Sequence, residues 1–105
     1  MSGLIHIRQT SQFAAWIAAL RDIRAKARIA ARIDRLAFDH MGDAKPVGGG
    51  VTELRIDYGP GYRLYVARRG GRYILLLCGG DKSTQRADIR QAHKLVAALE
   101  HDDGT

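Results

Sequence analysis

Residues 51–80 have the sequence VTELRIDYGPGYRLYVARRGGRYILLLCGG, which predicts three consecutive β-strands. Apolar and polar residues alternate in residues 51–58 and again in residues 62–68, as is typical of strands with one buried face. Residues 72–78 are nearly all apolar, as expected for a central strand covered on both faces. Glycine marks the two turns between the strands, at Gly59-Pro60-Gly61 and Gly70-Gly71.

The turns predict a register for this sheet. Across the first turn, the predicted pairs are Tyr58 with Tyr62, Ile56 with Leu64, Leu54 with Val66, Asp57 with Arg63, and Arg55 with Tyr65. Across the second turn, they are Val66 with Leu75, Leu64 with Leu77, and Arg63 with Cys78. Apolar residues then face apolar ones, so we expect helices to cover one apolar face. The opposite face carries Arg55, Arg63 and Tyr65.

A short strand and two amphipathic helices are predicted before this sheet. The strand covers residues 4–8, and Thr10 or Ser11 is expected to cap the first helix. The apolar face of that helix consists of Phe13, Trp16, Ile17 and Leu20. The second helix covers residues 22–38, with an apolar stripe of Ile29, Ile33, Leu36 and Ala37. The two helices are expected to form an antiparallel hairpin.

The remaining segments complete the predicted fold. Residues 39–50 contain Pro46 and three successive glycines and are expected to form a loop. Gly79-Gly80 is expected to end the last strand, and a helix starts near Ser83 or Thr84. Its buried stripe consists of Ile89, Ala92, Val96 and Leu99, with residues 101–105 frayed. We predict an α+β fold over residues 1–105: an N-terminal helical hairpin on a small twisted, mainly antiparallel sheet, with a C-terminal helix, in a single domain.

Composition favours an anionic partner and a reducing compartment. Seventeen Lys and Arg against eleven Asp and Glu give a net charge of +6, which suits nucleic acid or an acidic protein. The single cysteine, Cys78, excludes an intrachain disulfide. Residues 1–9 lack the pattern of a secretion signal, and the strongly apolar run at residues 73–78 is too short to span a membrane. We therefore expect a cytoplasmic protein with no membrane contact.

Two groups of basic residues are candidate binding sites. The predicted register brings Arg55, Arg63 and Tyr65 to one face, next to Gly80 and Lys82, where they could hold a phosphodiester. The structural alternative is a cross-strand ion pair between Arg63 and Asp57. The second helix carries a stripe within an arc of about 80°, which could contact nucleic acid or simply be solvated. That stripe consists of Arg21, Arg24, Arg28, Arg32 and Arg35.

Other kinds of site are poorly supported by the sequence. The four histidines lack the close spacing of metal ligands, and Cys78 has no companion, so no metal or other cofactor is expected. The glycines at residues 48–50 are not followed by the Lys-Ser/Thr pair of a P-loop. Residues 79–83 are more similar to an anion-binding helix N-terminus.

These motifs also resemble a known family. The string GVTELRIDYGPGYRLYVARRGGRYILLLCGGDKSTQRADIRQA (residues 50–92) is similar to the HigB-like, addiction-module killer branch of the RelE/ParE superfamily of toxins. Its characteristic elements are ELR, GPGYR, the apolar strand, and GGDKSTQ followed by a helix carrying DI. The upstream FAAWIAAL and RIDRL segments fit the same pattern. The resemblance covers nearly the whole chain.

The resemblance implies a type II toxin that cuts mRNA on the ribosome and so inhibits translation. Such toxins act without a metal, by attack of a ribose 2′-hydroxyl on the adjacent phosphate. Arg63 corresponds to the arginine of the GYR element, which stabilises the scissile phosphate, and Lys82 to the basic residue after the last strand. Arg55 of ELR is the third candidate cation. The implied partner is a helix-turn-helix antitoxin, through which alone the toxin would meet operator DNA.

The sequence departs from the family pattern at the expected proton-transfer residues. Some relatives have a tyrosine or histidine in the C-terminal helix, where this chain has Asp88, with His93 further along. Lysines of relatives in the strand before GPG are replaced by Val51 and Glu53. These departures leave two other hypotheses open: a ParE-like protein that poisons DNA gyrase without enzymatic activity, and an inactive or purely regulatory member.

Overall fold

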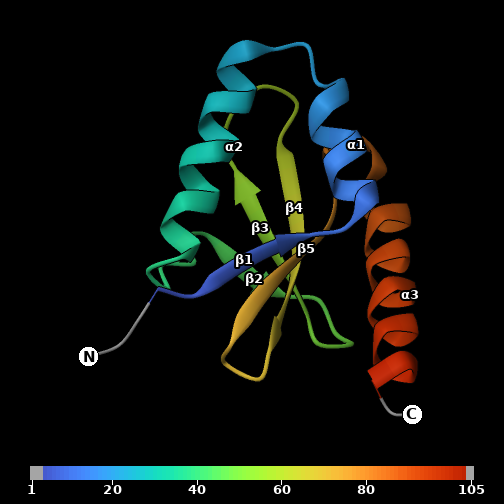
Figure 1. Cartoon of the computed structure of the whole chain (residues 1–105). Coiled ribbons are helices and arrows are strands. Elements are labelled where there is room, and N and C mark those ends of the chain that lie inside the picture. The colour runs from blue at the N-terminus through green and yellow to red at the C-terminus, as the bar shows by residue number, and fades with distance from the viewer. Residues whose placement is uncertain (1–3, 104–105) are drawn as a thin grey trace.

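The computed structural model describes the backbone of residues 4–103 and the side chains of residues 4–99. Five strands and three α-helices follow one another along the chain (Figure 1). Their bounds are β1 His6–Gln9, α1 Ser11–Ala19, α2 Ile23–Leu36, β2 Ala44–Pro46, β3 Val51–Ile56, β4 Tyr62–Arg69, β5 Tyr73–Gly80, the 3₁₀ turn η1 Lys82–Thr84, and α3 Gln85–Asp103. The predicted α+β fold with a helical hairpin, a mainly antiparallel sheet and a C-terminal helix is confirmed. The frayed end predicted for residues 101–105 lies outside the described side chains, although α3 itself continues to Asp103.

All strands belong to one sheet with the order β1-β5-β4-β3-β2. β1 pairs in parallel with β5, and the other three pairings are antiparallel. The sequence-based prediction of a continuous loop over residues 39–50 is wrong, because β2 pairs with β3 there. β2 is only three residues long and includes Pro46, so its sequence carries no period of alternation that could reveal it. Its position on the sheet edge tolerates that proline.

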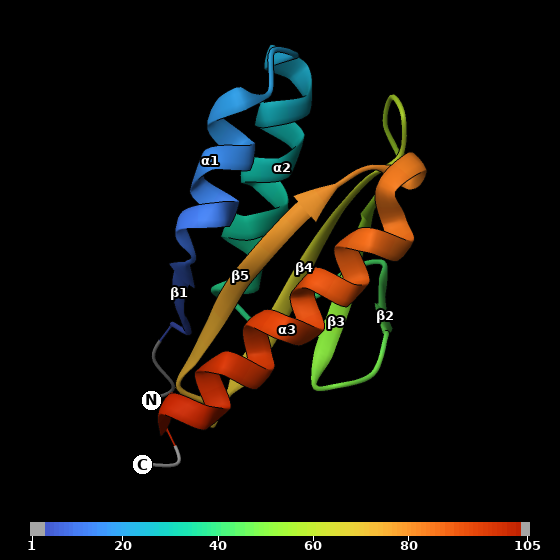
Figure 2. The ribbon, with the colours of Figure 1, turned by 90° about the vertical axis from the view of Figure 1, so that its right-hand side faces the viewer.

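Helices cover both faces of the sheet, as the apolar sequence of residues 72–78 predicts for a central strand. The α1–α2 hairpin lies on one side and α3 crosses the other (Figure 2). On the hairpin side, the buried core consists of Phe13, Ile29, Leu36, Leu54, Ile56, Leu64, Val66, Ile74 and Leu76. On the α3 side, it consists of Val51, Tyr65, Ala67, Leu77, Cys78, Ala92 and Val96. The face that carries Arg55, Arg63 and Tyr65 is therefore half core, and the rest of it adjoins the start of α3.

Side-chain caps fix where each helix begins. The hydroxyl of Thr10 accepts a hydrogen bond from the backbone N–H of Phe13 at 3.0 Å, as predicted for the first helix. Asp22 caps α2 by accepting from the N–H groups of Arg24 and Ala25. Asp81 does the same for η1 through Ser83. These caps explain why the helices start within one or two residues of their predicted positions.

The register between β3 and β4 differs from the predicted one by two residues. Ile56, and not Tyr58, pairs with Tyr62, so the connection spans residues 57–61 and is longer than the glycine-proline-glycine turn. A shift of two preserves the side-chain faces, since alternation has a period of two. Arg63 consequently lies opposite Arg55, and the proposed cross-strand pair with Asp57 is wrong.

The predicted register between β4 and β5 is also wrong, by one or two residues. An irregularity between Tyr65 and Val66 shifts the pairing, so that Arg63 lies opposite Gly80 and not opposite Cys78. β5 also continues through Gly79 and Gly80, which the sequence predicts to end it. Glycine is needed there because side chains approach the backbone closely from both sides of the sheet.

Gly79 is where α1 comes closest to the sheet. A Cβ atom at this position would lie 2.4 Å from two ring carbons of Trp16. We predict that Gly79→Ala lowers the free energy of unfolding by about 1–3 kcal/mol, as overpacking commonly does. Urea unfolding followed by circular dichroism measures it. If the indole is the obstacle, the same substitution costs much less in a Trp16→Leu background, and an equal cost in both backgrounds would contradict this explanation.

None of the helices in the described part of the chain combines the length and the apolar character needed to cross a membrane.

Candidate active site

A buried carboxylate organises the α3 side of the sheet near the end of β5. Glu53 lies in the middle of β3 with 0 % of its side chain exposed. Two guanidinium groups approach it: Nε of Arg55 lies 3.2 Å from Oε1, and Nε of Arg63 lies 3.7 Å from Oε2. A carboxylate removed from water in this way is stable only with charged or hydrogen-bonding partners.

Two neutral side chains complete the environment of Glu53. The hydroxyl of Tyr65 donates to Oε2 at 3.1 Å, and the amide of Gln85 donates to the same oxygen at 2.8 Å. Burial by itself raises the pKa of Glu53, but the hydrogen bonds from Gln85, Tyr65 and Arg55 and the charge of Arg63 together lower it below its usual range. Glu53 is therefore ionised and serves as an anchor for the cations around it.

Arg63 is held from two sides. Its Nη1 donates to the carbonyl of Gly61 at 2.8 Å, and its Nε faces Glu53 at a distance too long for a hydrogen bond. This Nε is buried and has no hydrogen-bond partner among the described residues. Only 13 % of the side chain is exposed. An arginine fixed in this way loses little conformational freedom when an anion binds to its remaining N–H groups.

Lys82, the first residue of η1, lies beside Arg63 and next to the turn between β3 and β4. A Cβ atom on Gly61 would lie 3.2 Å from Nη1 of Arg63 and 3.6 Å from Cβ of Lys82, so both side chains border this glycine. The backbone N–H of Lys82 also donates to the carbonyl of Pro60 at 3.4 Å. Lys82 itself is exposed. The three cations expected to form one cluster are thus brought together around Glu53 and Gly61.

A surface pocket of about 240 Å³ adjoins this cluster. It is lined by Arg55 and Arg63 together with Asp43, Ile56, Asp57, Gly61 and Tyr62. A second pocket, of about 250 Å³, lies on the other side of Ile56 and Asp57 and is lined by Arg28, Arg32 and Arg35 of α2. Both pockets are open and polar, which suits a flexible charged chain better than a small apolar ligand.

Tyr65 does not lie on a nucleic-acid surface, contrary to the sequence-based expectation. Its side chain is fully buried on the α3 side of the sheet. Burial raises the pKa of Tyr65, and the nearby Glu53 carboxylate raises it further. The alternation assigned Tyr65 correctly to the face of Arg63, but α3 covers that end of the face. Its hydroxyl contacts Glu53 and is shielded from solvent.

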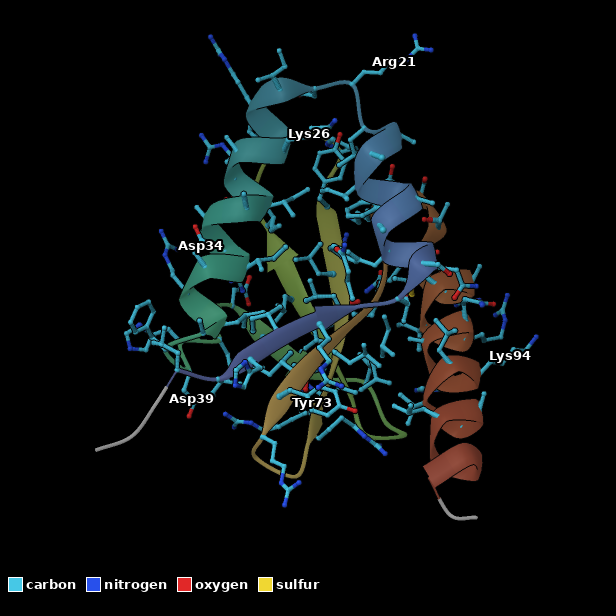
Figure 3. All side chains as sticks on the ribbon, viewed as in Figure 1. Arg21, Lys26, Asp34, Asp39, Tyr73 and Lys94 are labelled. Carbon is cyan, nitrogen blue, oxygen red and sulfur yellow. The ribbon has the colours of Figure 1, made fainter. Side chains whose placement is uncertain are left out.

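Arg32 is the exception within the arginine stripe of α2. It is 8 % exposed and donates to three backbone carbonyls: Met41 (3.1 and 2.9 Å), Asp43 (2.7 Å) and Arg55 (2.5 Å). Its expected role in RNA binding is therefore wrong, because every hydrogen bond it makes is used by the fold. The other members are exposed: Arg21, which precedes α2 (Figure 3), Arg24, Arg28 and Arg35.

The two proton-transfer candidates have different environments. Asp88 is half-buried in the first turn of α3, and its Oδ2 accepts from Thr84 at 2.6 Å. A Cβ atom on Gly80 would lie 1.9 Å from that oxygen, so Asp88 covers the strand residue directly opposite Arg63. Burial raises the pKa of Asp88, although the Thr84 hydrogen bond opposes this. His93 instead lies 3.0 Å from the carbonyl of Val47 and packs on the glycine loop.

Sequence reasoning overlooks Gln85 and does not give Glu53 its central position. Alternation places Glu53 on the same face as Arg55, which is the available signal, but no local pattern indicates that this position is buried. Among the described residues, no group of three His, Cys, Asp or Glu side chains is arranged to hold a metal ion. The side chains of this site can bind an anion and stabilise negative charge.

Comparison with known proteins places the chain in a family. Residues 15–98 match the family described as phage derived protein Gp49-like (DUF891). The chain belongs to this family. The chain is also similar to the "Uncharacterized protein" of Haemophilus influenzae, which is 52% identical over 95 residues, covering 90% of this chain and 96% of the relative. The matched residues include Glu53, Arg63 and Lys82, so the candidate site lies within the part of the chain that matches the family.

Proposed function

We propose that this Gp49-like protein is the toxin of a type II toxin–antitoxin pair and that it cleaves mRNA on the ribosome. The observation that carries the proposal is a surface pocket lined by Arg55 and Arg63, with Arg63 held by Glu53 and Gly61 and with Lys82 bordering the same glycine. The similarity of its motifs to the HigB-like branch of the RelE/ParE superfamily agrees with this, as does its Gp49-like membership.

The proposed reaction needs charge stabilisation more than any other contribution. The 2′-oxygen of a ribose forms a bond to the adjacent phosphorus while the bond to the 5′-oxygen breaks, which leaves a cyclic phosphate and a 5′-hydroxyl. The 2′-hydroxyl proton passes to a base, and the leaving oxygen receives a proton from an acid. Arg63 and Lys82 stabilise the negative charge that accumulates on the phosphorus oxygens in between, where a preorganised cation is most effective.

Asp88 is the better placed of the two candidates for proton transfer. It covers Gly80 of β5, which lies opposite Arg63 of β4, whereas His93 contacts the loop carbonyl of Val47. Its raised pKa suits a group that exchanges a proton near neutral pH better than that of an exposed aspartate. Glu53 does not suit this role, because both its oxygens are engaged by donors and its pKa is lowered.

Mapping mRNA ends in cells after brief induction tests the proposal. We expect new 5′ ends within translated frames for the wild type and none for Arg63→Ala. Arg63→Lys retains a positive charge beside Glu53. If this variant loses cleavage as well, the loss in Arg63→Ala does not come from an uncompensated carboxylate. Arg68→Ala on the same strand is the matched control, since Arg68 pairs with Asp39 at the exposed surface.

The other outcomes contradict either the endonuclease activity or the assignment of its active site to Arg63. Growth arrest with intact mRNA and damaged DNA would mean that the chain poisons gyrase. No arrest at all would mean an inactive or regulatory member. Cleavage that persists in Arg63→Ala would move the active site away from Arg63. Circular dichroism of each purified variant separates these results from a failure to fold.

A further inference from the structure

A line of four cations follows the outer side of α3 and its preceding turn. Lys82, Arg86, Arg90 and Lys94 repeat every fourth residue, and all four are exposed. Lys94 extends from α3 away from the sheet (Figure 3). Within residues 4–99, whose side chains the structure describes, none of the four forms an ion pair with a carboxylate. We call these residues the α3 basic stripe.

The α3 basic stripe is unfavourable for the helix that carries it. Like charges four residues apart face each other on an α-helix and destabilise it. Lys82 and Arg86 also lie at the N-terminal end, where the partial positive charge of the helix dipole disfavours cations. The nearby side chains of Asp81 and Asp88 accept hydrogen bonds from Ser83 and Thr84 and, within the described residues, form no ion pair with the stripe. A bound anion would remove both penalties, and a local conflict of this kind is typical of a functional surface.

The stripe borders a surface pocket of its own, which Lys82 links to the candidate active site. This pocket has a volume of about 500 Å³ and is lined by three of the cations, Lys82, Arg86 and Arg90, with hydroxyl and amide groups between them. Lys82 belongs to both regions, since it also borders Gly61 beside Arg63. The rise of an α-helix places residues i and i+4 about 6 Å apart along the axis, which is comparable with the separation of successive phosphates in a nucleic-acid strand.

The chemistry of the pocket favours nucleic acid over an acidic protein. Protein interfaces are usually centred on aromatic or large apolar residues. The exposed large hydrophobic residues of the described chain are Leu4, Ile23 and Phe38, none of which belongs to α3. The stripe therefore offers charge and hydrogen bonds without an apolar anchor, which is the pattern of a phosphate-backbone contact.

We propose that the α3 basic stripe binds the backbone phosphates of single-stranded RNA on one side of the phosphate held at Arg63. This assignment rests on the proposed function, because it takes the Arg63 pocket as the place of the scissile phosphate. Phosphate contacts position a strand without reading its bases. The stripe thus sets where the strand lies, and the register of cutting is set elsewhere.

Binding of a short single-stranded RNA with 2′-O-methyl riboses tests this, since such an RNA is not cut by 2′-hydroxyl attack. Fluorescence anisotropy is measured against salt concentration for the wild type and for the double variant Arg86→Gln/Arg90→Gln. The slope of log K against log salt should fall by about 0.7 for each phosphate that is no longer neutralised, or about 1.4 in all. The matched control Arg68→Gln/Arg72→Gln removes the same charge near the opposite end of β5 and should leave the slope unchanged.

The outcomes distinguish this inference from the proposed function. No RNA binding by the wild type, or equal slopes for the double variant and the wild type, would overturn the stripe while leaving mRNA cleavage to be judged by its own experiment. Equal losses in the double variant and the control pair would also overturn it, because net charge alone would then explain binding. A reduced slope specific to Arg86 and Arg90 supports the stripe even if Arg63→Ala arrests growth like the wild type. If the double variant binds RNA like the wild type but no longer binds an acidic protein partner, the surface belongs to that partner instead.

Discussion

Glu53→Ala is expected to lower the free energy of unfolding by roughly 3–5 kcal/mol, the cost typical of removing one partner from a buried ion pair. The substitution leaves the guanidinium of Arg63 without its counter-charge and the hydroxyl of Tyr65 without its acceptor. It also leaves a cavity beneath Gln85. Urea unfolding of the purified protein, followed by the fluorescence of Trp16 and by circular dichroism, measures the loss.

Glu53→Gln is the matched variant, because it keeps the shape and removes the charge. It should cost less than Glu53→Ala, since the amide oxygen can still accept from Tyr65. A loss below about 0.5 kcal/mol for Glu53→Ala, the usual range for exposed positions, would contradict the central place of this carboxylate.

The pH dependence of the stability of the wild type and of Glu53→Gln provides an independent check. The pKa of Glu53 is lower in the folded protein than its ordinary value of 4.5. Its contribution to stability is therefore complete above the unfolded pKa and is lost as the pH falls through the folded pKa. We expect the stability difference between wild type and Glu53→Gln to shrink steadily below about pH 4. A difference that stays constant down to about pH 2 would show that the carboxylate is not stabilised by its neighbours.

The elements with a clear period could be predicted from the sequence. The apolar repeats of α1 and α2, the alternation in β3 and β4, and the capping residues Thr10 and Asp22 all depend on short-range physics. β2 could not be predicted, since three residues contain too little pattern and its pairing with β3 supplies the hydrogen bonds. The predicted register fails because it infers turn lengths from glycine positions: the first connection already begins at Asp57, the second extends to Arg72, and an irregularity at Tyr65 and Val66 shifts the pairing further.

The candidate site could be predicted in part because alternation survives an error of two residues. Arg55 and Arg63 stay on one face under either register, and Lys82 follows the end of β5 in both cases. The predictions for Tyr65 and Arg32 fail for the opposite reason. A polar side chain can be buried when the tertiary structure provides partners, here Glu53 for Tyr65 and three carbonyls for Arg32. Those partners are distant in the sequence, so no local pattern indicates them.

Arg32→Met is expected to cost about 2–4 kcal/mol, because losing the donor to a buried carbonyl costs about 1–3 kcal/mol and three carbonyls share this guanidinium. Methionine replaces the apolar stem of the side chain and removes only its donors. The segment from Met41 to Asp43 then loses its attachment to α2. The backbone of Arg55 is affected as well, since its carbonyl accepts from Arg32 and its N–H donates to the carbonyl of Asp43.

Two comparisons isolate this arginine from the others on α2. Arg35→Met, an exposed position in the last turn of the same helix, should change the stability by less than about 0.5 kcal/mol. Gly42 has a φ of +70°, and a Cβ atom there would lie 2.7 Å from Nε of Arg32. Gly42→Ala should therefore cost more in the wild type than in the Arg32→Met background, where the displaced guanidinium is already gone and only the backbone strain is left. Equal costs in both backgrounds would mean that Gly42 is required for its φ alone, and that the guanidinium of Arg32 has room to move without loss of its carbonyl partners.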